Sequence, residues 1–238
     1  MSFETLLRLG DNALILGQRL AEWLGHSPIL EEDIASANIS LDLIGQARLW
    51  LALAGKVEGR GRDEDTLAFQ REDYEYRNCT MVELPNGDFA FTMVRRVLFD
   101  AYHGLLLERL AVSGDAEVAA IAAKSKKEVD YHRRHSADWV IRLGDGTDES
   151  HGRAQAALDA LWKYTHELFA PDAVDPGAAA LREPWLADVR AILCEATLKI
   201  PADGKFVSQG RQGVHSEHLA YLLAEMQVLH RSHPGAQW

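Results

Sequence analysis

The chain is poor in basic residues and in cysteine. Its 238 residues include 25 Lys and Arg against 36 Asp and Glu, which gives a formal net charge of −11 at pH 7. This balance argues against a nucleic-acid-binding protein, because phosphates attract clustered Lys and Arg. Cys79 and Cys194 lie far apart without a CxxC pattern, so neither a disulfide framework nor a thiolate zinc site is indicated.

The sequence also lacks a long apolar run. Polar residues interrupt its first 20 residues at helical spacing, namely Asp11, Asn12, Gln18 and Arg19. That interruption excludes both a signal peptide and a membrane span at this end of the chain. We therefore expect a cytoplasmic protein with no membrane partner and no nucleic-acid partner.

Strand patterns and the usual glycine-rich loops are missing as well. No window of alternating β-branched residues occurs, and no G-x-S-x-G nucleophile elbow, P-loop or dinucleotide motif is present. Short glycine-containing segments, such as "GDGTD" and "QGRQG", are typical of turns that end helices. Helical periodicity fills almost all of the rest, so the predicted fold is all-α.

Four long helices are expected, over about residues 6–23, 30–53, 88–112 and 116–143. Gly25 and Pro28 end the first, and Asp88 and Asp115 are the predicted N-caps of the third and fourth. Shorter helices are expected within 66–84 and over about 153–169, 185–198 and 214–231. Four long helices with shorter additions predict a four-helix bundle core with additional C-terminal helices.

The fourth long helix contains a metal-site-like stretch, "KKEVDYHRRH", which is residues 126–135. Glu128, His132 and His135 share one helical face there. Bundle sites that hold two metals take one Glu from each of two helices and Glu-x-x-His from each of the other two. In this helix the residue three after Glu128 is Tyr131, a much poorer ligand, and His132 is rotated away by one position.

The other helices are equally incomplete as a metal site. Asp42 is followed three residues later by Gly45, which has no side chain. Asp100 and His103 have the right spacing, although an intrahelical hydrogen-bonded pair is the commoner outcome. On the first helix the polar groups expected nearest the inner face are Gln18 and Glu22.

Three interpretations of the Glu128 face remain open: a solvated charge network, a buried polar network in a vacated metal pocket, and a working metal site. The apolar stripe favours the second, because it places His132 in line with Val129 and Trp139. A separate segment, Gly210–His218, leads through a glycine-flanked basic turn into the last helix. It is either a solvated helix start or a place where Arg211 and its neighbours dock another chain or anchor the tail.

Several segments together resemble a known family. They are "LRLGDNALILGQRLAEWLGHSPILEEDIASANISLDLIGQAR", "DEDTLAFQRED", "ELPNGDFA" and "GRQGVHSEHLAYLLAEMQ", with "PGAQW" at the end. The likeness, over nearly the full chain and in the right order, is to the structural (C) subunits of bacterial ring-1,2-phenylacetyl-CoA epoxidases. It implies a single ferritin-like helical domain over residues 1–238 and a role in phenylacetate catabolism.

The resemblance also implies partners. In that family a homologous catalytic subunit holds a di-iron centre, binds the aryl-CoA thioester and inserts one oxygen atom of O₂ into the ring. A reductase with FAD and an iron–sulfur cluster delivers electrons from NADPH, and the assembly includes a small accessory subunit. The C-type subunit has lost the iron ligands, carries no cofactor, acts as a scaffold and forms a homodimer in isolation.

By this correspondence some residues are vestigial ligand positions, and none is catalytic, cofactor-binding or metal-binding. The vestigial positions are Asp42, Gly45, Asp100, Glu128, Tyr131 and His132. Buried remnants need new partners, since an unpaired buried carboxylate is costly. We expect His132, Tyr131 and a nearby Arg such as Arg48 to supply them.

Two other functions stay open at this point. One is a self-sufficient di-iron oxygenase or oxidase that uses its own bundle residues: Asp42, Asp100, His103, Glu128 and His132. The other is a bundle whose emptied interior binds a small apolar molecule. The sequence assigns no role to His103 or His135.

Overall fold

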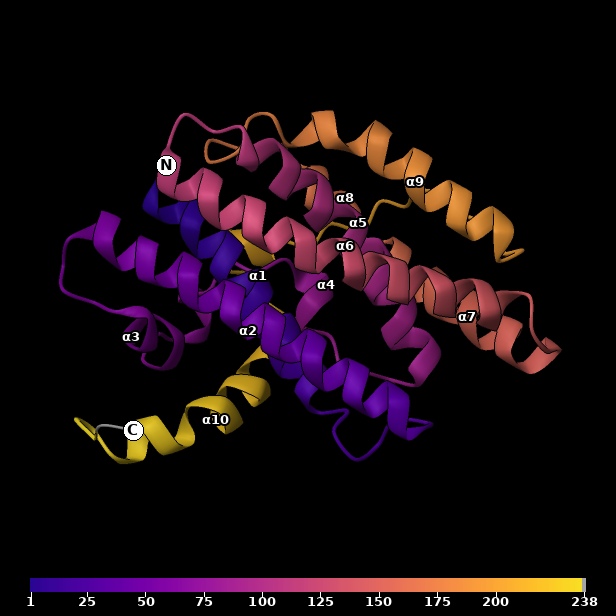
Figure 1. Cartoon of the computed structure of the whole chain (residues 1–238), viewed down its shortest axis with the longest axis horizontal. Coiled ribbons are helices and arrows are strands. Elements are labelled where there is room, and N and C mark those ends of the chain that lie inside the picture. Colours follow the sequence, from indigo (N-terminus) through magenta and orange to yellow (C-terminus); the bar gives the residue numbers. More distant parts are fainter. Residues whose placement is uncertain (237–238) are drawn as a thin grey trace. The chain divides into compact units, whose positions relative to one another are not determined.

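The computed structural model describes residues 1–236, and these residues are all-α (Figure 1). They contain no strand, only an isolated bridge between Gln209 and Val214. This confirms the predicted fold class and is consistent with a ferritin-like helical bundle. The last two residues of the "PGAQW" segment lie outside the described range. Within that range no helix has the combined length and apolarity needed to cross a membrane.

The chain divides into two compact units, one of residues 1–85 with the segment that starts at Ser208, and one of residues 86–207. They are called unit 1 and unit 2. The single domain over 1–238 stays a prediction.

Unit 1 is built on two long helices that pack side by side, α1 (Phe3–Ala21) and α2 (Leu30–Glu58). The predicted end of α2 near residue 53 is wrong by about a turn. Gly55 lies inside the helix, and the position requires glycine because an added Cβ would lie 2.0 Å from the carbonyl oxygen of Arg62. The helix ends instead at Gly59, whose φ of +71° suits glycine. The other elements of unit 1 are α3 (Glu64–Phe69), η1 (Asp73–Glu75), α4 (Thr80–Glu83), η3 (Gly210–Gln212) and α10 (Glu217–Ser232).

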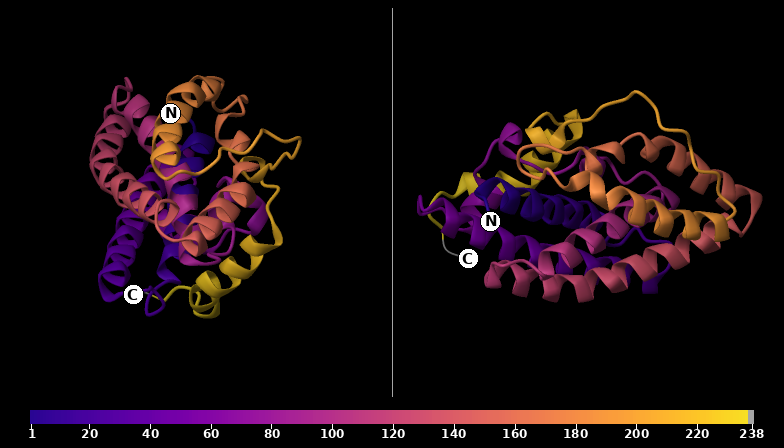
Figure 2. Two further views of the ribbon diagram at one scale, coloured as in Figure 1. Left: turned by 90° about the vertical axis from the view of Figure 1, so that its right-hand side faces the viewer. Right: turned by 90° about the horizontal axis from the view of Figure 1, so that it is seen from above.

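Unit 2 is built on a second pair, α5 (Phe89–Ala111) and α6 (Ala116–Gly144). The predicted caps are confirmed: the side chain of Asp88 accepts from the Phe91 N–H, and that of Asp115 from the Val118 N–H. Around the pair lie α7 (Asp148–Trp162), α8 (His166–Phe169), η2 (Ala178–Leu181) and α9 (Arg182–Glu195), seen from two further sides in Figure 2.

The helix expected over 153–169 is two helices in the structure. It begins five residues earlier than expected, because Thr147 and Ser150 form a capping box. It breaks after Trp162, and the hydroxyl of Thr165 donates to the carbonyl of Trp162 at 2.8 Å. The same carbonyl also accepts the backbone N–H of Thr165 at 3.0 Å, a tighter turn than that of an α-helix.

Candidate functional site

The interior between α5 and α6 of unit 2 is polar along part of its length. The two helices bury mostly apolar side chains, but their buried polar side chains include these six, each at most 2% exposed: Arg96, Asp100, His103, Ser125, His132 and Ser136. Burying a polar group is costly unless it is hydrogen-bonded, so a cluster of this size in one interior needs a structural or functional reason. This cluster is therefore the candidate functional site.

Arg96 is the centre of the cluster and is fully buried. Its guanidinium donates to the Asp100 carboxylate at 3.4 Å and to the backbone carbonyl of His132 at 3.0 Å. Its other terminal nitrogen lies 3.0 Å from Nδ1 of His135. Because a guanidinium can only donate, Nδ1 of His135 is the acceptor in this contact.

Asp100 has a second donor in this cluster. The hydroxyl of Ser136 donates to the same carboxylate at 3.0 Å. A buried carboxylate with a cation and a hydroxyl as partners is stabilised without a metal. The expectation that Arg48 supplies the positive charge is wrong, since its side chain is 76% exposed and pairs with Glu64 at 3.3 Å. Arg96, which no sequence motif singled out, supplies it from one turn before Asp100.

His103 lies in the same interior but makes no hydrogen bond. Both ring nitrogens are buried and unpartnered, and the ring lies 5.3 Å from that of Phe99. Burial, and secondarily the nearby His132, lower the pKa of His103 to about 3. The ring is therefore neutral. The expected intrahelical pair of Asp100 and His103 is not formed, because Asp100 faces Arg96.

The remaining vestigial positions of α6 lie on the flank of that helix. Glu128 is within 4.0 Å of Lys124, as an ion pair along the helix. Tyr131 is 46% exposed, and its ring lies 6.4 Å from that of His132 and 6.2 Å from that of His135. The structure thus places Tyr131 beside both histidines, while Glu128 faces a lysine.

Two more positions belong to α2 in unit 1. Asp42 is half-buried there, and a Cβ added at Gly45 would meet nothing within 4 Å. On α1 the prediction for Glu22 is wrong. It is exposed and accepts from Arg19 at 2.7 Å. The polar residues that α1 buries are Arg8, Asp11, Asn12 and Arg19.

The polar side chains of unit 2 do not fit a di-iron centre of the kind that the family resemblance implies for the catalytic subunit. Such a centre needs carboxylates and imidazoles that converge with open positions between them. Asp100 is instead held by Arg96, whose charge repels a metal cation. Across residues 1–236 no three His, Cys, Asp or Glu side chains converge as a metal site would require.

A second buried polar cluster, in unit 1, surrounds Glu83. Its Oε2 accepts from the amide of Asn78 at 2.8 Å and lies 2.7 Å from Nδ1 of His215, while Oε1 accepts from the Ser216 N–H at 2.6 Å. Nε2 of His215 lies 3.1 Å from the carbonyl oxygen of Tyr76. Both carboxylate oxygens of Glu83 therefore have partners, and both ring nitrogens of His215 face oxygen atoms of unit 1.

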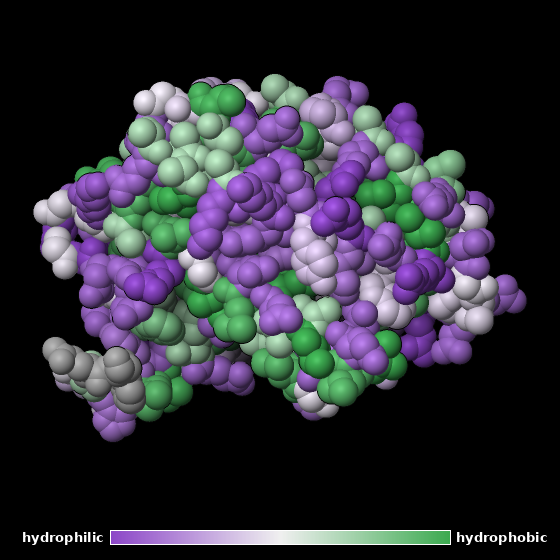
Figure 3. Space-filling view, in the orientation of Figure 1, coloured by the Kyte–Doolittle hydropathy of each residue, from purple (hydrophilic) through white to green (hydrophobic). Residues whose placement is uncertain are grey.

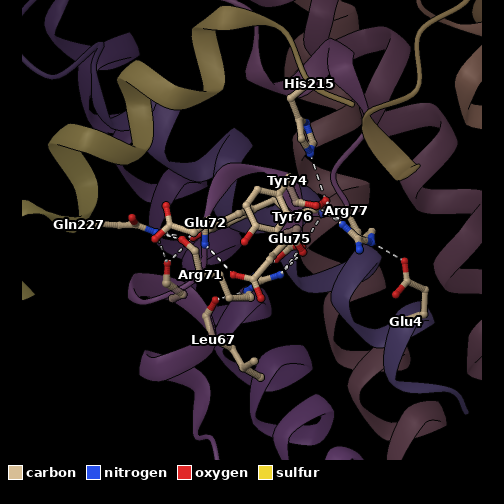
Figure 4. Close-up of polar contacts among 12 residues, drawn as sticks. Glu4, Leu67, Arg71, Glu72, Tyr74, Glu75, Tyr76, Arg77, His215 and Gln227 are labelled. Atoms are coloured by element: carbon tan, nitrogen blue, oxygen red, sulfur yellow. Dashed lines mark hydrogen bonds and ion pairs between the residues drawn. The ribbon is translucent and has the colours of Figure 1, made fainter. Parts of the chain in front are cut away.

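The glycines of the Gly210–His218 segment allow it to approach unit 1 closely. A Cβ at Gly210 would lie 2.6 Å from the carbonyl oxygen of Asn78, and one at Gly213 would lie 2.4 Å from that of Tyr74. Figure 4 shows His215 pointing at the Tyr74–Arg77 stretch, and Gln227 reaching toward Arg71 from α10. The segment therefore anchors the C-terminal helix, one of the two roles considered from the sequence. The glycine-flanked turn was visible there, but its buried partner Glu83 was not.

Gly213→Ala is expected to destabilise this anchor by about 2 kcal/mol, because the added Cβ meets backbone in a left-handed conformation. The control is Gly235→Ala, which shares a φ near +80° but has open space around it. Hydrogen exchange of α10 and chemical unfolding measure the effect. Equal changes in the two variants would show that the close approach carries no energy.

Long helix pairs with a partly polar interior define the class, a ferritin-like helical bundle protein. The family model described as "Phenylacetic acid catabolic protein" matches residues 1–238, so the chain belongs to that family. A curated relative is the C subunit of the 1,2-phenylacetyl-CoA epoxidase of Escherichia coli (strain K12). It is 49% identical over 241 residues, which cover 98% of this chain and 97% of the relative. The resemblance seen in the sequence is confirmed.

Proposed function

We propose that this chain is the non-catalytic structural subunit of a multicomponent phenylacetyl-CoA ring-1,2-epoxidase in aerobic phenylacetate catabolism. It binds and stabilises a homologous catalytic subunit that carries the di-iron centre. The cofactors FAD, iron–sulfur cluster and NADPH belong to a reductase subunit. The complex is cytoplasmic and includes a small accessory subunit. The name of the 49% identical relative, a subunit of such an epoxidase, supports this proposal.

The observation that carries the non-catalytic role is the position of Arg96. A catalytic bundle presents its interior carboxylates to iron, whereas here the interior carboxylate of Asp100 is bonded to a fully buried guanidinium. The positive charge in this interior is therefore that of Arg96, which also links α5 to the backbone carbonyl of His132 on α6. Unlike an iron ion, a guanidinium has no coordination position for O₂. The cluster serves packing.

A face of α2 supports the scaffold role. Leu30, Ile34 and Leu41 are 71%, 54% and 66% exposed, and they lie on one side of the helix. Figure 3 shows green, apolar surface where the N-terminal half of α2 runs. Several large apolar side chains exposed on one helical face, here with Asn38 between Ile34 and Leu41, are typical of a protein-binding site. Because Gly45 continues the stripe with open space above it, a partner helix can approach closely.

Leu41→Glu tests this function. A charge in the middle of the α2 stripe is expected to weaken binding of the catalytic subunit at least ~100-fold, since a buried unpaired carboxylate costs several kcal/mol. The thermal midpoint of the isolated chain should not change. The control is Val112→Glu, which alters an 84% exposed side chain in unit 2 and should leave binding intact.

Two results would contradict the proposal. One is unchanged affinity of Leu41→Glu for the catalytic subunit in a titration with purified proteins. The other is near-stoichiometric iron in this chain when it is purified from iron-supplemented cells. That second result, with O₂-dependent activity of the chain alone, would point to a self-sufficient di-iron oxygenase.

A further inference from the structure

A groove runs along one side of the C-terminal helix in unit 1. It has a volume of about 480 Å³ and lies between η1 and α10. One wall is the row Ala220, Ala224 and Val228, spaced four residues apart. Rows of this spacing form the ridges and grooves by which helices pack, and small side chains keep the groove open. From Ala220 to Ser232 it extends about 18 Å, or roughly three helical turns.

The floor of the groove is fixed in place. Leu223 is buried, and the amide of Gln227 donates to the carbonyl of Arg71 and to the hydroxyl of Tyr76, each at 3.0 Å. Figure 4 shows Gln227 directed from α10 into this cluster. A partner therefore meets a surface that is already ordered, which lowers the entropy cost of binding.

The opposite wall is acidic. Glu72 and Asp73 line it. Glu72 is paired with Arg231 at 3.1 Å, while within residues 1–236 the carboxylate of Asp73 accepts from the N–H of the next residue, Tyr74, at 2.8 Å and meets no cation. The wall therefore keeps a negative charge that a partner cation can meet at Asp73.

Two tyrosines that follow lining residues in the sequence are exposed. Tyr74 follows Asp73 and is 64% exposed, and Tyr221 follows Ala220 on α10 and is 71% exposed. Tyrosine is enriched in protein interfaces because it buries a large rigid area and keeps a polar tip. An open groove of helix length with an acidic wall and exposed tyrosines nearby in the sequence suits a protein segment better than a small molecule, which prefers an enclosed cavity.

We propose that this groove binds an amphipathic helix of a second partner subunit. That helix has an apolar stripe against Ala220, Ala224 and Val228, and a Lys or Arg against Asp73. The inference rests on the proposed function, in which the chain is a scaffold. It adds a docking surface separate from the α2 stripe, since no residue of α2 lines the groove. One scaffold then holds two different subunits.

The experiment purifies the whole assembly through a tag on this chain, from cells that express every subunit. Ala224→Trp fills the groove, and Asp73→Lys reverses the charge of its wall. Each is expected to reduce one subunit at least tenfold while the catalytic subunit remains at its wild-type ratio. The loss with Asp73→Lys should be accompanied by a weaker salt dependence of binding. The control is Glu225→Trp, an exposed position of α10 outside the groove, which should retain every subunit.

Two outcomes would overturn this inference. Retention of all subunits by Ala224→Trp would show that nothing docks in the groove. Loss of the catalytic subunit from Ala224→Trp would assign the groove to the catalytic partner. Circular dichroism and the thermal midpoint of each variant verify that α10 is still folded. Because Leu41→Glu tests the catalytic interface separately, failure of the proposed function is distinguishable from failure here.

Discussion

Arg96→Met is expected to lower the free energy of unfolding by about 3–5 kcal/mol, one of the largest effects of any single substitution in this chain. The guanidinium is fully buried and is the cation beside Asp100, so its removal leaves a buried carboxylate with only the Ser136 hydroxyl. It also removes the bond from α5 to the His132 carbonyl on α6. Urea unfolding monitored by circular dichroism measures the loss.

A double substitution separates the charge from the loss of packing. In Arg96→Met with Asp100→Leu no unpaired charge remains, and most of the lost stability should return. Arg48→Met is the matched control, because its ion pair with Glu64 is exposed and should contribute less than about 1 kcal/mol. If Arg96→Met and Arg48→Met cost the same, the buried network would not hold α5 and α6 together.

His103→Leu is expected to stabilise the protein, and more so in acid. At neutral pH it removes two unpaired buried nitrogens, which should raise the free energy of unfolding by about 1–3 kcal/mol. The pKa of His103 is lowered to about 3, so between its ordinary value near 6.5 and about 3 the unfolded chain binds a proton that the folded chain does not. The wild-type protein therefore loses stability as pH falls through that window.

The variant lacks this acid-linked loss. At pH 4.5 the further difference between His103→Leu and wild type should reach about 3 kcal/mol, from about 1.4 kcal/mol per pKa unit. Urea unfolding from pH 7.5 to 4.5 measures both slopes. His26→Leu, at an exposed position of unit 1, is the control and should keep the wild-type slope. Parallel slopes for His103→Leu and wild type would contradict the burial of a neutral imidazole.

The sequence predicted the helices well and some of their ends poorly. The caps Asp88 and Asp115 were correct because N-capping is local, with side chain and backbone two or three residues apart. The end of α2 was placed too early because Gly55 looks like a stop signal. In the structure Gly55 is needed because the Arg62 carbonyl approaches it closely, and that contact forms only when the chain folds.

The candidate site was predicted in part. The spacing of Glu128, Tyr131 and His132 indicated that a metal pattern is incomplete, and the position of His132 in the buried stripe was confirmed. The spacing did not indicate which cation meets Asp100. Arg48 and Arg96 look equally suitable in the sequence, but α2 exposes the first and α5 buries the second.

By itself, the sequence determined the all-α class, the order of the helices and the membership of the family, because helical periodicity and family motifs are local patterns of neighbouring residues. Only the tertiary structure decided the partners of the buried charges: Arg96 for Asp100, and His215 for Glu83, which lies 132 residues away. Such pairs depend on which faces pack together after folding. Burial away from water then strengthens each pair, and no local sequence pattern predicts which residues will pair.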